Sequence, residues 1–281
     1  MKCMHWGVWL CTWTLPLLAA AEDTTSTPAP SAQPLQQVAA WPTSANLSGL
    51  AFLPPGLKAL NNDAGSNPVS LWLDRGALAW ADATSGPSCA SCHGKVESLR
   101  PAVVTFPRLA TDSKRLVNLE DQIQACRTRS GKATRKDGAE NDEELALSAL
   151  LHQAAQGLTW NVKAPTAKAS ENAAWQAHLQ QGASLYVQRI GRMNLACLHC
   201  HDQNIGKQLR ADVISPGHPT GFPVYRMSWQ GLGTVERRLR ACFSGVQAQM
   251  PPPGDPVLRD LELYLKVRAS GMPLEGPSIR R

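Results

Sequence analysis

Two copies of one short cysteine and histidine pattern constrain this chain more than any other feature. The first copy is Cys89, Cys92 and His93, and the second is Cys197, Cys200 and His201. Each Cys-x-x-Cys-His segment places two thiols and one imidazole on about one turn of chain. This arrangement suits thioether attachment of a haem by both thiols and ligation of its iron by the histidine. A zinc or redox Cys-x-x-Cys with an incidental histidine is the alternative. Because both copies occur, we expect two covalently bound c-type haems.

The two motifs lie in halves of the chain that match each other. Leu73 to Gly76 and Leu179 to Gly182 are corresponding Leu-x-x-Gly segments ahead of each motif. Phe106-Pro107 lies 20 and 19 residues before Cys126, and Phe222-Pro223 lies equally far before Cys242. A duplicated domain explains this register. Together with the helical spacing of the apolar residues, it predicts an all-α protein with two tandem class I cytochrome c domains.

Local composition predicts which segments precede the two domains and where the domains begin. Residues 1–21 combine a basic start, an apolar run and three alanines, which predicts a secretory signal peptide cleaved after Ala21 and a periplasmic protein. Residues 22–66 are rich in Thr, Ser, Pro and Ala and predict an irregular N-terminal arm. The domains are expected at 67–165 and 166–281. No later stretch is apolar enough to predict a membrane span.

The charge of the chain limits its partners. The formal net charge is +6, without a long basic run or a stacking motif. This balance argues against nucleic-acid binding and favours an anionic substrate or an acidic protein surface.

The residue at the sixth iron position separates electron transfer from catalysis. Met250, which precedes Pro251 and Pro252, is one candidate for the second haem, and Cys242 is the other. The first domain has no methionine after His93, but it has Cys126 at the position equivalent to Cys242. Cysteine ligation is therefore favoured in both domains. The alternatives are a Cys126–Cys242 disulfide or two buried thiols.

Each later cysteine is expected to lie on a short helix, capped by Asn118 or Thr234. Arg238 lies four residues before Cys242 and hence on the same helical face. A guanidinium there would favour a thiolate and bind an oxyanion. The first domain has Gln122 at this position. The alternative is that Arg237, Arg238 and Arg240 form a solvated basic face or pair with haem propionates. His199, between the second pair of cysteines, is expected to face solvent.

From about Asn67 onward, the sequence resembles the SoxA family of dihaem cytochromes, subunits of the SoxAX complex or L-cysteine S-thiosulfotransferase. The resemblance rests on Asn67-Pro68, Leu71-Trp72, the two haem motifs, Arg238-Leu-Arg-Ala-Cys242 and the tail from Leu261 to Arg280. The stretch from Thr128 to Asp142 matches no feature of the family.

The resemblance implies a ligand set and a reaction. Cys89 and Cys92 would bind the first haem, with His93 and Cys126 as axial ligands. Cys197 and Cys200 would bind the second haem, with His201 and Cys242 as axial ligands. Cys242 would carry a persulfide and Arg238 would bind substrate.

The implied reaction joins thiosulfate oxidatively to a cysteine of the carrier protein SoxYZ and passes two electrons to cytochrome c. A monohaem cytochrome, SoxX, would be the stable partner. The competing hypothesis is a dihaem cytochrome that only transfers electrons, with Met250 as the distal ligand. A dihaem peroxidase would need an acid/base group that the sequence does not indicate.

Overall fold

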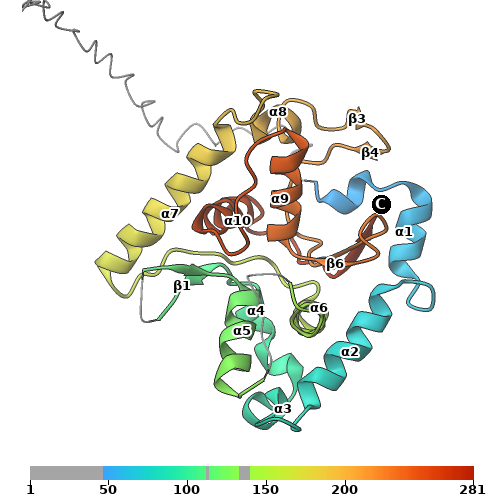
Figure 1. Ribbon diagram of the computed structural model, residues 1–281, viewed down its shortest axis with the longest axis vertical. Coiled ribbons are helices and arrows are strands. Elements are labelled where there is room, and N and C mark those ends of the chain that lie inside the picture. The colour runs from blue at the N-terminus through green and yellow to red at the C-terminus, as the bar shows by residue number, and fades with distance from the viewer. Residues whose placement is uncertain (1–46, 112–113, 133–139) are drawn as a thin grey trace, which may run out of the picture. The chain divides into compact units, whose positions relative to one another are not determined.

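The computed structural model describes residues 47–111, 114–132 and 140–281 (Figure 1). The predicted signal peptide and residues 22–46 of the predicted arm lie outside the described residues. The described residues all belong to one compact unit. None of their helices combines the length and the apolar character needed to cross a membrane.

Helices account for most of the regular structure. They are η3 (Gly49–Phe52), α1 (Pro55–Asn62), α2 (Val69–Ala81), α3 (Cys89–His93), η4 (Val96–Leu99), α4 (Arg100–Val103), α5 (Leu119–Arg129), α6 (Asp142–Ala155), α7 (Ala169–Val187), α8 (Cys197–His201), α9 (Val235–Gly245) and α10 (Pro256–Arg268). The predicted all-α class is confirmed.

The strands are short. They are β1 (Arg108–Leu109), β2 (Leu116–Val117), β3 (Gln208–Leu209), β4 (Asp212–Val213), β5 (Val224–Arg226), β6 (Gly231–Gly233) and β7 (Ser278–Arg280). β1 pairs with β2 and β3 pairs with β4, both antiparallel, whereas β5 lies between antiparallel β6 and parallel β7. The parallel partner β7 brings the C-terminal residues beside β5 and α1.

Two glycines allow the long helices to cross closely. Gly76 of α2 faces α6, and a Cβ atom there would lie 2.4 Å from the carbonyl oxygen of Ala146. Gly182 of α7 faces α10, and a Cβ atom there would lie 2.1 Å from the carbonyl oxygen of Asp260. These are the glycines of the two Leu-x-x-Gly segments. The same close crossing therefore occurs once in each half of the chain.

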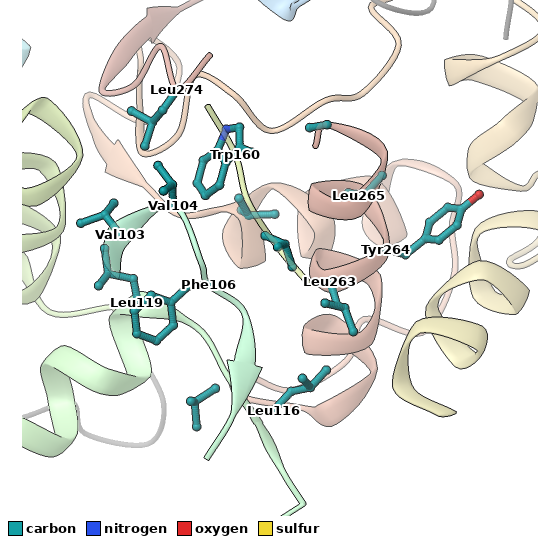
Figure 2. Close-up of a cluster of buried hydrophobic side chains, with 14 of the residues drawn as sticks. Val103, Val104, Phe106, Leu116, Leu119, Trp160, Leu263, Tyr264, Leu265 and Leu274 are labelled. Carbon is teal, nitrogen blue, oxygen red and sulfur yellow. The ribbon is translucent and has the colours of Figure 1, made fainter. Parts of the chain in front are cut away.

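One hydrophobic cluster joins the two halves (Figure 2). Phe106 and Leu116 from the first half and Leu263 from the second belong to the same group of buried side chains. Trp160 lies among them, and its backbone N–H donates to the carbonyl oxygen of Met272. The chain that follows α6 is thereby paired with the chain that follows α10, and the two halves share a core.

The last part of the predicted arm contains a helix that the sequence did not indicate. Helix α1 begins at Pro55, where the fixed φ of proline suits the first helical position. The Asn61 side chain accepts a hydrogen bond from the backbone N–H of Ile279 at 2.9 Å. This helix is held by contact with the C-terminal strand, a tertiary contact without a local sequence signal.

Candidate functional site

The two Cys-x-x-Cys-His segments form the one-turn helices α3 and α8. The Ser88 hydroxyl caps α3 by accepting from the backbone N–H of Ser91 at 3.0 Å. In α8, Nδ1 of His199 accepts from the backbone N–H of Ala196 at 2.8 Å. The prediction that His199 faces solvent is therefore wrong, because this half-buried ring caps the helix.

The helices of the two later cysteines begin at the predicted caps. Asn118 accepts from the backbone N–H of Asp121 at 2.9 Å, and Thr234 accepts from that of Arg237 at 3.2 Å. Cys126 and Cys242 each lie eight residues after the cap, on the third turn of α5 and α9. The equivalent caps set equivalent positions for the two sulfur atoms.

The second motif and Cys242 come together in one cluster. The Nδ1 atom of His201 lies 2.7 Å from the carbonyl oxygen of Ser215, and the ring is also hydrogen-bonded to the Cys242 thiol. Because Nδ1 is engaged by Ser215, Nε2 is the ring nitrogen left to face the sulfur. The chain after His201 is anchored through Asp202, which accepts from Tyr186 at 2.7 Å and Arg268 at 2.9 Å.

The sulfur atoms of this cluster differ in acidity. Burial raises the pKa of the Cys197 thiol to about 11, and the nearby Cys242 raises it further. Burial and Cys242 also raise the pKa of Cys200. For Cys242 itself, burial raises the pKa, but the hydrogen bond with His201 opposes it and the net pKa is lowered. The cluster therefore favours a thiolate at Cys242 and neutral thiols at the attachment positions.

Two arginines add positive charge beside Cys242. Arg238, on the same face of α9, and Arg226, on β5, both contribute to the lowered pKa of the Cys242 thiol. Arg226 has its Nε atom buried without a hydrogen-bond acceptor among the described residues. Its only carboxylate partner in this part of the chain is Asp212, at 3.6 Å. The cluster thus offers two guanidinium groups to an anion.

Arg226 was not predicted from the sequence. It lies 16 residues before Cys242, with no periodic relation to it. Strand pairing places it opposite Arg280, in a register that only the folded sheet defines.

The first cluster has a different environment. Gln122 Nε2 lies 3.5 Å from Cys126 Sγ, and Arg129 Nη2 lies 3.1 Å from the same sulfur. Burial raises the pKa of Cys89, and a smaller increase comes from Cys126, which places these two thiols near each other. Cys92 and His93 are exposed. The structure therefore brings Cys89 towards Cys126, and Cys126 is bonded by two donors from its own helix.

Two alternatives to cysteine ligation were ligation by Met250 and a disulfide. Met250 has 47% of its surface exposed. The next residue, Pro251, accepts from Arg240 Nε at 3.0 Å, and Arg240 lies roughly 200° around the helix from Cys242. Met250 is therefore held beside a different face of α9. All six described cysteines are free, which excludes the predicted alternative of a Cys126–Cys242 disulfide.

These residues fit covalently attached haem. In the second cluster, a histidine whose Nδ1 is fixed by a backbone carbonyl faces a sulfur across the attachment thiols. Such fixation of the outer ring nitrogen is usual for metal-ligating histidines. Within the described residues, no three or more His, Cys, Asp and Glu side chains are grouped to hold a bare metal ion. The fold and the site define a c-type cytochrome.

Comparison with known proteins agrees with this class and narrows it. Residues 75–160 match the family model of the SoxA/TsdA cytochrome c domain. The chain is similar to the L-cysteine S-thiosulfotransferase subunit SoxA of Pseudaminobacter salicylatoxidans, with 33% identity over 85% of this chain and 82% of the relative. It is 32% identical to the subunit of the same name from Paracoccus pantotrophus, over 83% of this chain and 78% of the relative.

A solved structure supports the same relationship. The crystal structure of SoxXA from P. pantotrophus superposes with a TM-score of 0.74 and 30% identity, covering 83% of this chain and 86% of that chain. The chain belongs to the SoxA family, and it is a cytochrome that binds haem c covalently.

Proposed function

We propose that this chain is the dihaem cytochrome subunit of an L-cysteine S-thiosulfotransferase. It carries two haems, attached through Cys89 and Cys92 in the first half and through Cys197 and Cys200 in the second. His93 and Cys126 would hold the iron of the first haem. His201 and Cys242 would hold that of the second, where the reaction would take place.

One observation carries the proposal: a sulfur that faces a histidine also lies beside two guanidinium groups. Cys242 is hydrogen-bonded to His201 and is influenced by the charges of Arg238 and Arg226. Arg238 is half-buried, and its side chain forms no hydrogen bond or ion pair within the described residues. In a protein that only transfers electrons, this cation would instead serve a haem propionate or a partner.

The residues of the cluster define the roles in the reaction. Arg238, with Arg226 behind it, binds the sulfonate oxygens of thiosulfate, because guanidinium groups hold oxyanions through paired hydrogen bonds. Cys242, as a persulfide, presents the reactive sulfur. When bound, the haem supplies an electron acceptor at the iron.

Atoms and electrons balance as follows. The carrier cysteine loses its thiol proton, and a bond forms between its sulfur and the outer sulfur of thiosulfate. Two electrons are released in this oxidation and pass to an external cytochrome c. The product is a cysteine S-thiosulfonate on the carrier.

The partners follow from the same proposal. SoxYZ supplies the carrier cysteine, and a SoxX-like monohaem cytochrome forms the heterodimer, as the SoxXA name of the similar crystal structure suggests. The protein acts in the periplasm after cleavage of its signal peptide at about Ala21.

Replacing Arg238 tests the proposal. In the complex with its monohaem partner, Arg238→Ala should lower kcat/KM for thiosulfate about 100-fold, the usual effect of removing one donor that stabilises developing charge. Arg240→Ala is the matched control, because Arg240 lies on the same helix but binds the carbonyl of Pro251. Haem content and helicity should be unchanged in both variants. Wild-type turnover in Arg238→Ala would refute the role given to this residue.

A further inference from the structure

A large groove lies between residues of the first half of the chain and the start of α7, and none of the described residues that line it belongs to the Cys242 cluster. Its volume is about 970 Å³. It is enclosed by the β1–β2 hairpin, one face of α5, the segment that leads into α7, and the start of α7. The lining residues of α5 are Asp121, Gln122, Ala125 and Arg129. Among the described lining residues there is none from α3, so the groove is separate from the first haem-attachment segment.

The groove is lined by more basic than acidic side chains. Its cations are Arg108, Arg115, Arg129, Lys163 and Lys168, and its acids are Asp121 and Glu171. Both acids already have partners within the chain. Asp121 binds Arg259 through two contacts of 2.6 and 2.8 Å, and Glu171 binds Lys168 at 3.0 Å.

Three of the cations remain without a carboxylate partner in the described part of the chain. Arg108 is exposed and stacks over the Phe106 ring at 4.6 Å. Arg129 is exposed, and its Nη2 atom lies 3.1 Å from Cys126 Sγ. Lys163 is exposed on the segment that leads into α7. These cations come from three different elements, so they surround the groove.

One buried side chain that lines the groove has a hydrogen-bond donor without an acceptor among the described residues. Trp175 lines it, is only 5% exposed, and has an indole N–H without an acceptor among the described residues. Buried donors are rarely left unpaired in native structures, because an unmade hydrogen bond is costly. Ala110 and Ala125 also line the groove, and their small side chains leave room for an extended backbone. A ligand rich in acceptors and negative charge would satisfy this surface.

We propose that this groove binds an extended acidic segment of a partner protein. Cations on three different elements, around a volume of about 970 Å³, favour an extended ligand over a single small oxyanion. Exposed ion pairs are individually weak, so useful affinity requires several at once, as a chain of carboxylates provides. Recognition of acidic segments by clusters of arginine is a common mode of peptide binding.

A ligand in the groove would also affect the hydrogen bonds that Cys126 accepts. Arg129 and Gln122 line the groove and also donate to Cys126 Sγ. A carboxylate in the groove therefore competes with this sulfur for the Arg129 guanidinium. The inference goes beyond the proposed thiosulfotransferase activity, because Cys242 and Arg238 take no part in it.

The test measures binding of a fluorescein-labelled hexaglutamate peptide to the haem-loaded protein at low ionic strength. We expect saturable binding by the wild type. In Arg108→Glu/Lys163→Glu, the dissociation constant should rise at least tenfold. Lys58→Glu/Lys207→Glu is the control, with the same change in net charge at two exposed lysines outside the groove. It should bind within twofold of the wild type.

Three outcomes would overturn the proposal. The first is the absence of saturable binding by the wild type. The second is an equal loss of affinity in the two double variants, which would mean attraction by net charge alone. The third is displacement of the peptide by sulfate at a matched concentration of negative charge, which would identify a small oxyanion as the ligand. Thiosulfate turnover is not part of the measurement, so failure of the proposed activity would not imitate any of these results.

Discussion

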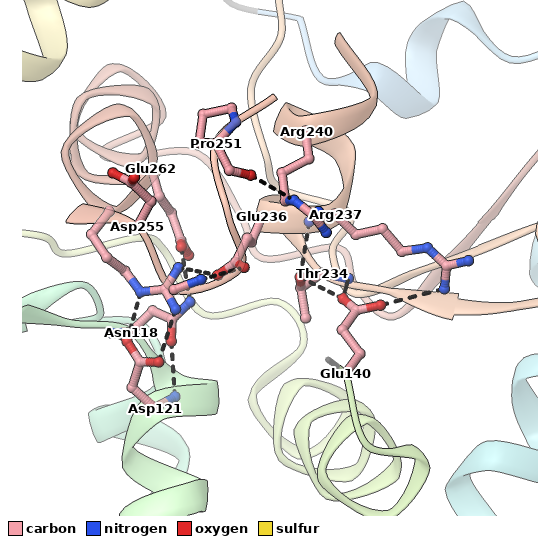
Figure 3. A network of polar contacts seen from close by, with 12 residues as sticks. Asn118, Asp121, Glu140, Thr234, Glu236, Arg237, Arg240, Pro251, Asp255 and Glu262 are labelled. Carbon is pink, nitrogen blue, oxygen red and sulfur yellow. Dashed lines mark hydrogen bonds and ion pairs between the residues drawn. The ribbon is translucent and has the colours of Figure 1, made fainter. Parts of the chain in front are cut away.

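One buried arginine joins the two helices that carry Cys126 and Cys242. Arg259 of α10 binds Asp121 of α5 through Nε at 2.6 Å and Nη2 at 2.8 Å, and its Nη1 atom binds Glu236 of α9 at 2.5 Å. Its side chain is 4% exposed, and those of Asp121 and Glu236 are 13% and 10% exposed. Figure 3 shows this network with the neighbouring caps of α5 and α9.

Arg259→Met should destabilise the protein strongly. The variant keeps a long side chain but removes the buried cation that joins the Asp121 and Glu236 carboxylates. Removing one partner of a buried ion pair typically costs about 3–5 kcal/mol. In a domain of about 150–250 residues, each kcal/mol shifts the melting temperature by roughly 2–4 °C. The expected decrease in Tm is therefore about 6–20 °C.

Arg75→Met is the matched control. Arg75 binds Asp142 at 2.8 Å, but the two side chains are 50% and 66% exposed. Exposed pairs contribute about 0–1 kcal/mol. Urea denaturation of the haem-loaded proteins, followed by circular dichroism at 222 nm and by haem absorbance, gives both free energies of unfolding. If Arg259→Met unfolds within about 1 kcal/mol of Arg75→Met, the buried network does not hold the two helices.

Two further predictions concern the ligand and the helix crossings. Near-infrared magnetic circular dichroism of the oxidised protein should show thiolate ligation at both haems. Cys242→Ala should abolish it at one haem and Met250→Ala should leave it intact; a thioether band that Cys242→Ala does not change would instead place Met250 on the iron. Gly182→Ala should lower the free energy of unfolding by about 1–3 kcal/mol, because the new methyl group meets the α10 backbone. Gly56→Ala, where the methyl group meets open space in α1, should be neutral or stabilising by up to about 1 kcal/mol, and equal effects of the two changes would contradict the crossing geometry.

The features that could be predicted from the sequence depend on neighbouring residues or occur once in each half of the chain. Asn118 and Thr234 cap helices because a short polar side chain before a helix satisfies its first free N–H groups, wherever the helix then packs. The glycines at 76 and 182 could be recognised because the duplication repeated a Leu-x-x-Gly segment ahead of each haem motif. The repeat thus drew attention to two residues at helix crossings that a single copy would not have indicated.

The residues that were missed depend on contacts between distant segments. Arg226 joins the Cys242 cluster only because β5 pairs with β6 and β7. Helix α1 forms against the C-terminal strand 218 residues further along the chain, through Asn61 and Ile279. The position of Met250 could not be predicted from its proline neighbours, because it depends on the hydrogen bond between Arg240 and Pro251. No local pattern encodes such contacts.

The two duplicated cysteine helices differ in how much of each sulfur remains available. Cys126 accepts hydrogen bonds from Gln122 and from the charged Arg129, both on its own helix. Hydrogen bonds from charged donors hold electron density on the sulfur and make it a weaker nucleophile. At Cys242, the equivalent of Gln122 is Arg238, and the equivalent of Arg129 is Gly245. The donor from the following turn is thereby removed.

Arg238, which stands in place of Gln122 four residues before the cysteine, would be available to bind a substrate. The Arg238 side chain makes no hydrogen bond or ion pair to any described residue, so its guanidinium is free for an incoming anion. An anionic substrate would be drawn to the second sulfur and would find the first already engaged by its own helix. Two changes within one helical turn on either side of the cysteine therefore contribute to the difference between the two sulfur sites, together with His201 and Arg226 beside Cys242.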